Sequence, residues 1–124
     1  MTRAALAIDH KHQGRNCCQA VLLAYADRLS LSEVELMRLG APFGMGMGNM
    51  EGPCGALCGA QMVAGLLSDT PRVPAKRIAE LFAQRAGSLT CKTLKGVGCG
   101  RPLCSCDGCV SIAVEVAQEV LEGV

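Results

Sequence analysis

Apolar residues recur along most of the chain at the three- and four-residue spacings of amphipathic helices. Bounded by cap and stop residues, this pattern predicts helices over residues 2–12, 16–29, 30–39, 53–67 and 74–85, and a last helix after Asp107. A chain of 124 residues buries enough surface for one core. We therefore expect an all-α fold: a single compact helical domain, residues 1–124, of about five to six helices with Gly-rich loops.

Polar residues and prolines mark where several of these helices begin. Asn16 is a favourable N-cap for the second helix, and Asp107 is expected to cap the last one. Pro53 suits the first position of the helix that follows it. Glycines in residues 44–52 and 96–100 predict two loops, and the first of these either turns or approaches another segment closely.

The last helix is apolar almost all round. After Ser111 its polar residues form one narrow strip, consisting of Glu115, Gln118, Glu119 and Glu122. A helix of this kind is expected at the centre of a fold or at a subunit contact. A homodimer is therefore one prediction.

Composition narrows the class of protein. A formal net charge of +1 with mixed signs provides no basic stripe for phosphates, which argues against nucleic-acid binding. No apolar stretch has membrane-spanning length and no signal peptide is recognisable, so we expect no membrane insertion and a cytoplasmic location. Because the cytoplasm keeps thiols reduced, the nine cysteines are better explained as redox groups or metal ligands than as disulfides.

Four cysteines lie in or beside the first turn of a predicted helix or turn. They are Cys17 after Asn16, Cys54 after Pro53, Cys91 after Thr90, and Cys106 beside Asp107. A helix N-terminus presents unpaired N–H groups and the positive end of the helix dipole, both of which favour thiolate over thiol. The thiolate is the nucleophilic and metal-binding form of cysteine. If these helix starts converge, they would stabilise a thiolate cluster or an anionic iron–sulfur centre.

Cysteine density gives a second group of candidate ligands. Cys99, Cys104 and Cys109 share the segment CGRPLCSCDGC with Cys106, and such a loop can wrap a metal. Its spacing matches no standard zinc or ferredoxin pattern. Cys18 and Cys58 are instead candidates for inert packing, which is common for a buried free cysteine.

Other metal-binding side chains give weaker signals. Met45, Met47 and Met50 alternate with glycine and could bind a soft ion such as Cu(I), although methionines more often fill gaps in a core. His10 and His12 are two residues apart, so they point to different sides of a helix and cannot clamp one metal together.

Three segments together resemble a known family: NCCQAV at residues 16–21, CGALCG at residues 54–59 and GSLTCK at residues 87–92. With Cys106, they resemble the C-GCAxxG-C-C family of redox-active proteins over residues 14–121, and the CGAxxG motif is complete. The resemblance implies a helical structure, redox activity and four family cysteines. These cysteines fall on Cys17, Cys54, Cys91 and Cys106, the same four that lie at helix starts.

The resemblance also implies a cofactor. A similar domain occurs in split-Soret cytochromes, where an iron–sulfur centre is associated with it. Haem attachment is not implied, because the chain has no C-x-x-C-H.

Three functional hypotheses follow. The first is an electron-transfer module in which the four family cysteines ligate an iron–sulfur cluster and a redox partner protein exchanges electrons with it. The second is a metal-free dithiol–disulfide oxidoreductase in which Cys54 attacks and another family cysteine, such as Cys17, resolves. The third is a zinc or Cu(I) binding or carrier protein. No HExxH, GxSxG or standard phosphate loop supports a hydrolase or nucleotide-binding protein.

Overall fold

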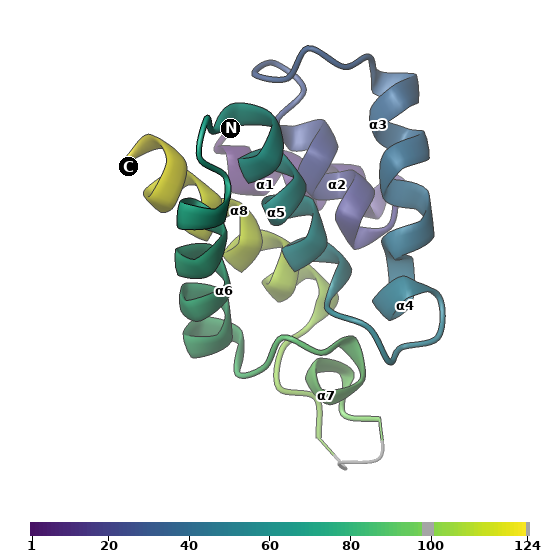
Figure 1. The fold of residues 1–124 in the computed structure, drawn as a ribbon. Coiled ribbons are helices and arrows are strands. Elements are labelled where there is room, and N and C mark those ends of the chain that lie inside the picture. The colour runs from purple at the N-terminus through teal and green to yellow at the C-terminus, as the bar shows by residue number, and fades with distance from the viewer. Residues whose placement is uncertain (98–100, 124) are drawn as a thin grey trace.

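The computed structural model describes residues 1–97 and 101–123. All the regular secondary structure within these residues is helical (Figure 1). The helices of eight or more residues are α1 (Arg3–His12), α2 (Cys17–Ala24), α3 (Glu33–Gly40), α5 (Gly55–Leu67), α6 (Arg72–Ala86) and α8 (Cys106–Glu122). The chain also forms two shorter helical turns, α4 (Gly44–Met47) and α7 (Cys91–Lys95), and a 3-10 turn at Ala41–Phe43 directly before α4. The all-α prediction is confirmed, and the expected five to six helices omit the two short turns.

Local capping explains where most helices begin. Asn16 and Ser32 each form a reciprocal capping box, with Gln19 and Glu35 respectively. The prediction that Asp107 caps the last helix is wrong, because the Ser105 hydroxyl accepts a hydrogen bond from the Gly108 N–H at 3.0 Å. Helix α8 therefore begins at Cys106, which places that cysteine inside the first turn.

The start of α5 also differs from the prediction. Pro53 lies outside the helix and forms an isolated antiparallel bridge with Thr90. The N–H of Cys54 donates to the carbonyl of Leu89 at 2.7 Å, which holds this segment extended until Gly55. Cys54 is consequently the N-cap residue of α5, where its sulfur lies next to the free N–H groups of the first turn.

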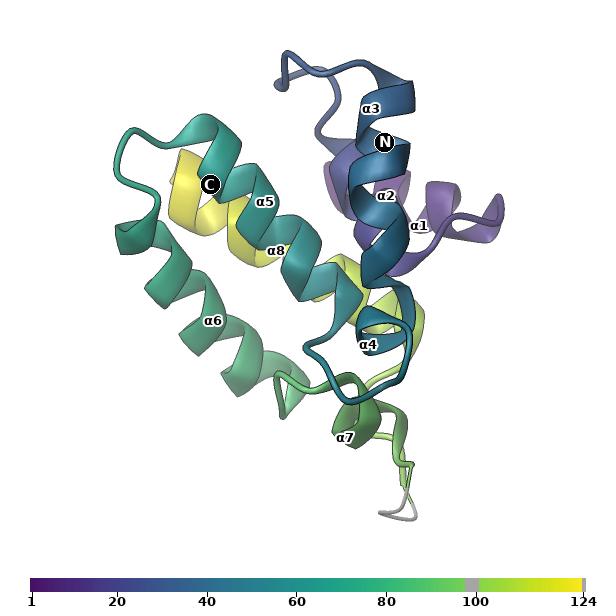
Figure 2. The ribbon, with the colours of Figure 1, turned by 45° about the vertical axis from the view of Figure 1, so that its right-hand side comes forward.

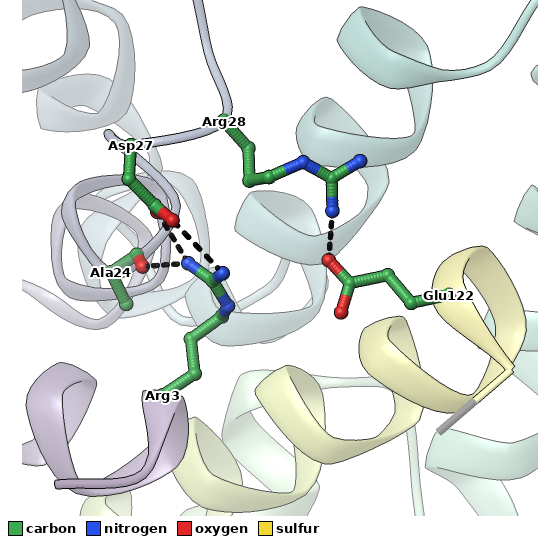
Figure 3. Close-up of polar contacts among 5 residues, drawn as sticks. All are labelled: Arg3, Ala24, Asp27, Arg28 and Glu122. Carbon is green, nitrogen blue, oxygen red and sulfur yellow. Dashed lines mark hydrogen bonds and ion pairs between the residues drawn. The ribbon is translucent and has the colours of Figure 1, made fainter.

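Helix α2 ends at Ala24 and not near Leu29 as predicted. The Arg3 guanidinium donates to the carbonyl of Ala24 at 2.6 Å and to the carboxylate of Asp27 at 2.6 Å (Figure 3). The carbonyl of Ala24, which would accept the next helical hydrogen bond, is thus bonded to the Arg3 side chain of α1. The chain leaves the helix at this point. Beside it, Arg28 pairs with Glu122 at the end of α8.

Helix α8 is the centre of the fold, as its apolar surface predicted. It contacts α1, α2, α5 and α6, and Figure 2 shows it running behind α5. Val110, Val114 and Val116 are fully buried. Among the described residues, no helix combines the length and apolar character needed to cross a membrane.

The contact between α2 and α5 depends on two glycines of the CGALCG motif. A Cβ atom placed on Gly59 would lie 2.9 Å from Cβ of Val21 and 3.0 Å from the carbonyl oxygen of Cys18. One placed on Gly55 would lie 3.4 Å from the backbone nitrogen of Cys18 on α2, and 2.8 Å from the carbonyl oxygen of Phe43 in the 3-10 turn. These separations are too short for a side chain, so the glycines allow the two helices to approach closely.

Gly59→Ala should destabilise the protein by about 1–3 kcal/mol, because the added methyl group overpacks the contact between α2 and α5. Gly65→Ala is the matched control, since Gly65 lies on the same helix and nothing is within 4 Å of its added Cβ. That control should stabilise the helix by about 0.5–1 kcal/mol. Urea unfolding followed by circular dichroism measures both changes; equal effects at the two positions would contradict the packing role of Gly59.

Candidate functional site

Four cysteine side chains from four separate segments line one cavity of about 310 Å³. They are the four that the sequence placed at helix starts: Cys17 on α2, Cys54 before α5, Cys91 on α7 and Cys106 on α8. Cys17, Cys91 and Cys106 are the first residues of their helices, and Cys54 is an N-cap. The structure therefore brings together residues that are up to 89 positions apart in the chain.

Backbone hydrogen bonds hold the cavity wall formed by α7 and the Gly-rich segment before α5. The N–H of Cys91 donates to the carbonyl of Gly52 at 3.1 Å, and that of Lys92 donates to Met50 at 3.0 Å. A Cβ placed on Gly46 would lie only 2.7 Å from Cβ of Cys91. The predicted loop thus approaches another segment closely, and that segment carries a family cysteine.

The methionines of this segment adopt an uncommon backbone conformation. Met45, Met47 and Met50 have φ of 53°, 63° and 63°, in the left-handed region. The expectation that these methionines fill the core is wrong for Met45 and Met47, whose side chains are 68% and 54% exposed. Met45 and Met50 are among the residues that line the cysteine cavity.

The cavity is electrostatically positive. Among the described residues it is lined by two lysines, Lys11 and Lys95, and by no carboxylate. The Nζ atom of Lys95 is buried. Although desolvation lowers it, the pKa of Lys95 is raised overall, because the neighbouring sulfur atoms of Cys106, Cys109 and Cys17 favour the ammonium form.

Cys54 is the thiol most easily ionised in this environment. Hydrogen bonding from the Cys109 thiol lowers the pKa of Cys54 to about 6, although burial opposes the charged form. The backbone N–H groups of Leu57 and Ala56, in the first turn of α5, and the charge of Lys95 act in the same direction. At neutral pH the Cys54 side chain is therefore mainly thiolate.

Two other cavity cysteines remain thiols. Burial, together with the charges of Cys106 and Cys54, raises the pKa of Cys17 to about 12. Burial also raises the pKa of Cys91, although Lys95 opposes this. Ionising these sulfurs beside the Cys54 thiolate requires additional positive charge in the cavity.

The other cysteines in the described part of the chain lie outside the lining of this cavity. Cys18 is fully buried, its Sγ lies 3.8 Å from Sδ of Met62, and burial raises its pKa to about 12, in agreement with inert packing. Cys58 lines a different, apolar groove. Cys109 is fully buried in α8, and its interaction with the Cys54 sulfur raises its pKa. Cys99, another of the candidate ligands, lies outside the described residues.

The described residues contain no group of three or more Cys, His, Asp or Glu side chains placed to hold a single metal ion. The four thiols surround a volume instead of meeting at one point. His12 is on the surface, where its Nε2 atom lies 2.6 Å from a carboxylate oxygen of Asp107, so it takes no part in the cavity.

Two residues of the site, Lys95 and Lys11, are absent from the sequence-based candidates. Lys95 lies four positions after Cys91 on α7, and this spacing places both residues on one helix face. The spacing could therefore have predicted that Lys95 lies at the same site as Cys91. Lys11 carries no such local signal, because only the packing of α1 against α8 brings it to the cavity. Cys109 was proposed as a loop ligand, yet it lies within α8 and against Cys54.

The low pKa of Cys54 predicts how its reactivity depends on pH. Because iodoacetamide reacts with thiolate, alkylation of Cys54 should be near its maximum at neutral pH and should fall to half at a pH of about 6 as the thiolate is protonated. Peptide mass spectrometry at each pH resolves Cys54 from the other cysteines.

A lysine variant tests the cause of that shift. Lys95→Gln removes a charge that lowers the pKa of Cys54, so the midpoint should move to higher pH. Lys76→Gln, on the exposed face of α6, is the control and should leave it unchanged. A wild-type midpoint in the ordinary cysteine range, near about 8.5, would contradict the assignment.

Comparison with known proteins gives one match. A family model described as "Putative redox-active protein (C_GCAxxG_C_C)" matches residues 15–120. No curated protein and no solved structure matches the chain. The matched residues include all four cavity cysteines and most of the helical core. The chain therefore belongs to the C_GCAxxG_C_C family of redox-active proteins.

Proposed function

We propose that this protein is an electron-transfer module that holds an iron–sulfur cluster through Cys17, Cys54, Cys91 and Cys106. The observation that carries the proposal is the convergence of these four thiols on one cavity. Cysteine thiolates are the usual ligands of iron–sulfur clusters, and four are the usual number. When bound, such a cluster supplies one-electron transfer at a defined potential.

The size and charge of the cavity support a polyatomic anionic group. Its volume of about 310 Å³ is roughly ten times the share of one water molecule in the liquid. A cluster ligated by four thiolates carries net negative charge, and the cavity offers Lys11, Lys95 and the N-termini of three longer helices against it. Hydrogen bonds and charges of this kind around sulfur ligands also set reduction potential.

Each residue around the thiols has a role in this proposal. Lys95 balances the charge of Cys106 and Cys54, and the N–H groups of Leu57 and Ala56 favour the Cys54 thiolate. Cys17 and Cys91 are thiols in the metal-free protein, so they release protons when they become ligands. Loading should accordingly weaken as the pH falls. A redox partner protein would exchange the electrons.

A second function is favoured by a separate observation, the lowered pKa of Cys54. In a metal-free dithiol–disulfide oxidoreductase, the Cys54 thiolate attacks a substrate disulfide and a second thiol then displaces the product. Cys17 and the other family cysteines are the partners expected from the sequence. This function needs the same cavity but no metal.

The first experiment is anaerobic purification followed by an absorption spectrum and analysis of iron, sulfide, zinc and copper in one sample. The proposal predicts stoichiometric iron and sulfide with visible bands that bleach on reduction. Cys54→Ser should abolish both signals. Cys58→Ser, one helical turn further along α5 and outside the cavity, is the matched control and should retain them.

Two results would decide against the cluster. A colourless, metal-free protein with titrating thiols would favour the oxidoreductase, and stoichiometric zinc or copper without iron would favour the metal-carrier hypothesis. Full iron and sulfide content in Cys54→Ser would show that the ligands are misassigned.

A further inference from the structure

Three methionines near the cysteine cavity adopt a backbone conformation that is unfavourable for a residue with a side chain. The φ angles of Met45, Met47 and Met50 are all positive, and glycine is the residue that adopts such angles at low cost. Met45 and Met47 are 68% and 54% exposed, so these side chains bury little area within the fold. A strained backbone that presents apolar side chains to solvent indicates a function outside the core.

These methionines lie at the end of the molecule that contains the cavity. Met45 and Met50 line the cavity. Met47 lies against its wall, because a Cβ atom placed on Gly52 would be 3.0 Å from Sδ of Met47, and the carbonyl of Gly52 accepts the N–H of Cys91. Figures 1 and 2 both show α4 and α7 together at this end. We call the surface of the three methionines the methionine face.

Lysines gather at the same end. Of the four lysines in the chain, Lys11 and Lys95 line the cavity, and Lys92 follows Cys91 on α7. The fourth, Lys76, lies on α6 among residues that line a different cavity with the last turn of α8. Three of the four lysine charges are therefore concentrated around the cysteine site.

Two carboxylates lie near these lysines, and each is already paired. An oxygen of Glu51 lies 3.4 Å from Nζ of Lys92, and an oxygen of Asp107 lies 2.6 Å from Nε2 of His12. In residues 1–97 and 101–123, neither lysine that lines the cavity forms a salt bridge with a carboxylate. The positive charge at the cavity is thus available to an external partner.

We propose that the methionine face and the lysines around it dock an acidic electron-transfer protein, whose own redox centre is surrounded by carboxylates. The docking surface rests on the proposed function, because the partner exchanges electrons with a cluster in the cavity. One electron passes between the two redox centres, so that one is oxidised as the other is reduced, and no covalent bond changes.

Apolar and charged groups have separate roles in this docking. Methionine side chains are flexible and polarisable, so they adapt to the surface of a partner. The lysines attract a partner of opposite charge and orient it toward the cavity, which raises the rate of association. A second copy of this chain fits this surface poorly, because its own cavity end would bring lysines against lysines.

The test measures docking independently of the cluster. The full chain is mixed with an acidic plant-type ferredoxin, and a water-soluble carbodiimide links lysine amines to carboxylates across the interface. Peptide mass spectrometry identifies the linked lysines. We expect links at Lys11, Lys92 or Lys95, and their yield should fall at least about fivefold in about 0.5 M NaCl because salt screens the charges.

Two controls accompany the cross-linking. Lys76 is an internal control, since it lies on the exposed face of α6 and away from the methionine face. A basic cytochrome c replaces the ferredoxin as the control protein, and it should give few links at any lysine because its surface charge has the same sign as the lysines.

A methionine variant tests the apolar part of the surface. Met47→Ala removes an exposed side chain that does not line the cavity, so ferredoxin affinity measured by calorimetry should fall at least about threefold. Val73→Ala is the matched control, because Val73 is 72% exposed on α6, and it should leave the affinity unchanged. Circular dichroism checks that both variants are folded.

The outcomes separate the docking surface from the proposed function. No complex with ferredoxin at low salt, links that are equal at all four lysines or strongest at Lys76, or equal affinities of Met47→Ala and wild type would overturn the docking surface. Iron and sulfide are measured on the same preparation. Links at the cavity lysines in iron-free protein would support the surface and overturn the cluster, whereas a cluster-containing protein that does not dock would do the reverse.

Discussion

The close approach of α2 to α5 is the contact on which the cysteine site depends. Gly55 and Gly59 lie against the start of α2, where no side chain would fit. This approach sets Cys17, the first residue of α2, beside Cys54, the N-cap of α5, on the same cavity. The family motif therefore combines two features: its first cysteine lines the cavity, and its glycines allow the packing that brings a second cysteine to the same cavity.

Opposing electrostatic effects decide which sulfur is charged. Burial disfavours the thiolate forms of Cys17 and Cys91, and the neighbouring Cys54 thiolate disfavours them further. Lys95, the N–H groups at the start of α5 and the Cys109 thiol all favour Cys54. The result is a thiolate at Cys54 beside two thiols, Cys17 and Cys91, that stay protonated until further positive charge arrives. The same arrangement suits a ligand set that assembles around a metal cluster and a dithiol that reacts without one.

Local sequence signals predicted the helices better than their ends. Asn16 could be recognised as a cap because its partner is three residues away, whereas Ser105 and Asp107 were both suitable and only Ser105 bonds to the helix. The convergence of the four helix starts depends on tertiary packing, so the sequence could suggest it but not establish it. Lys11 shows the limit most clearly, because it reaches the cavity only through the packing of α1 on α8.

The salt bridge between Arg28 and Glu122 lies at the opposite end of α8 from Cys106. Seventeen helical residues separate the two ends, a rise of about 25 Å. Arg3, near the start of the chain, lies at the same end as Glu122 (Figure 3). An affinity tag placed near Arg3 or Glu122 would therefore lie at the end of α8 remote from the cysteine cavity, and immobilising the protein through it would keep the support away from the cavity cysteines.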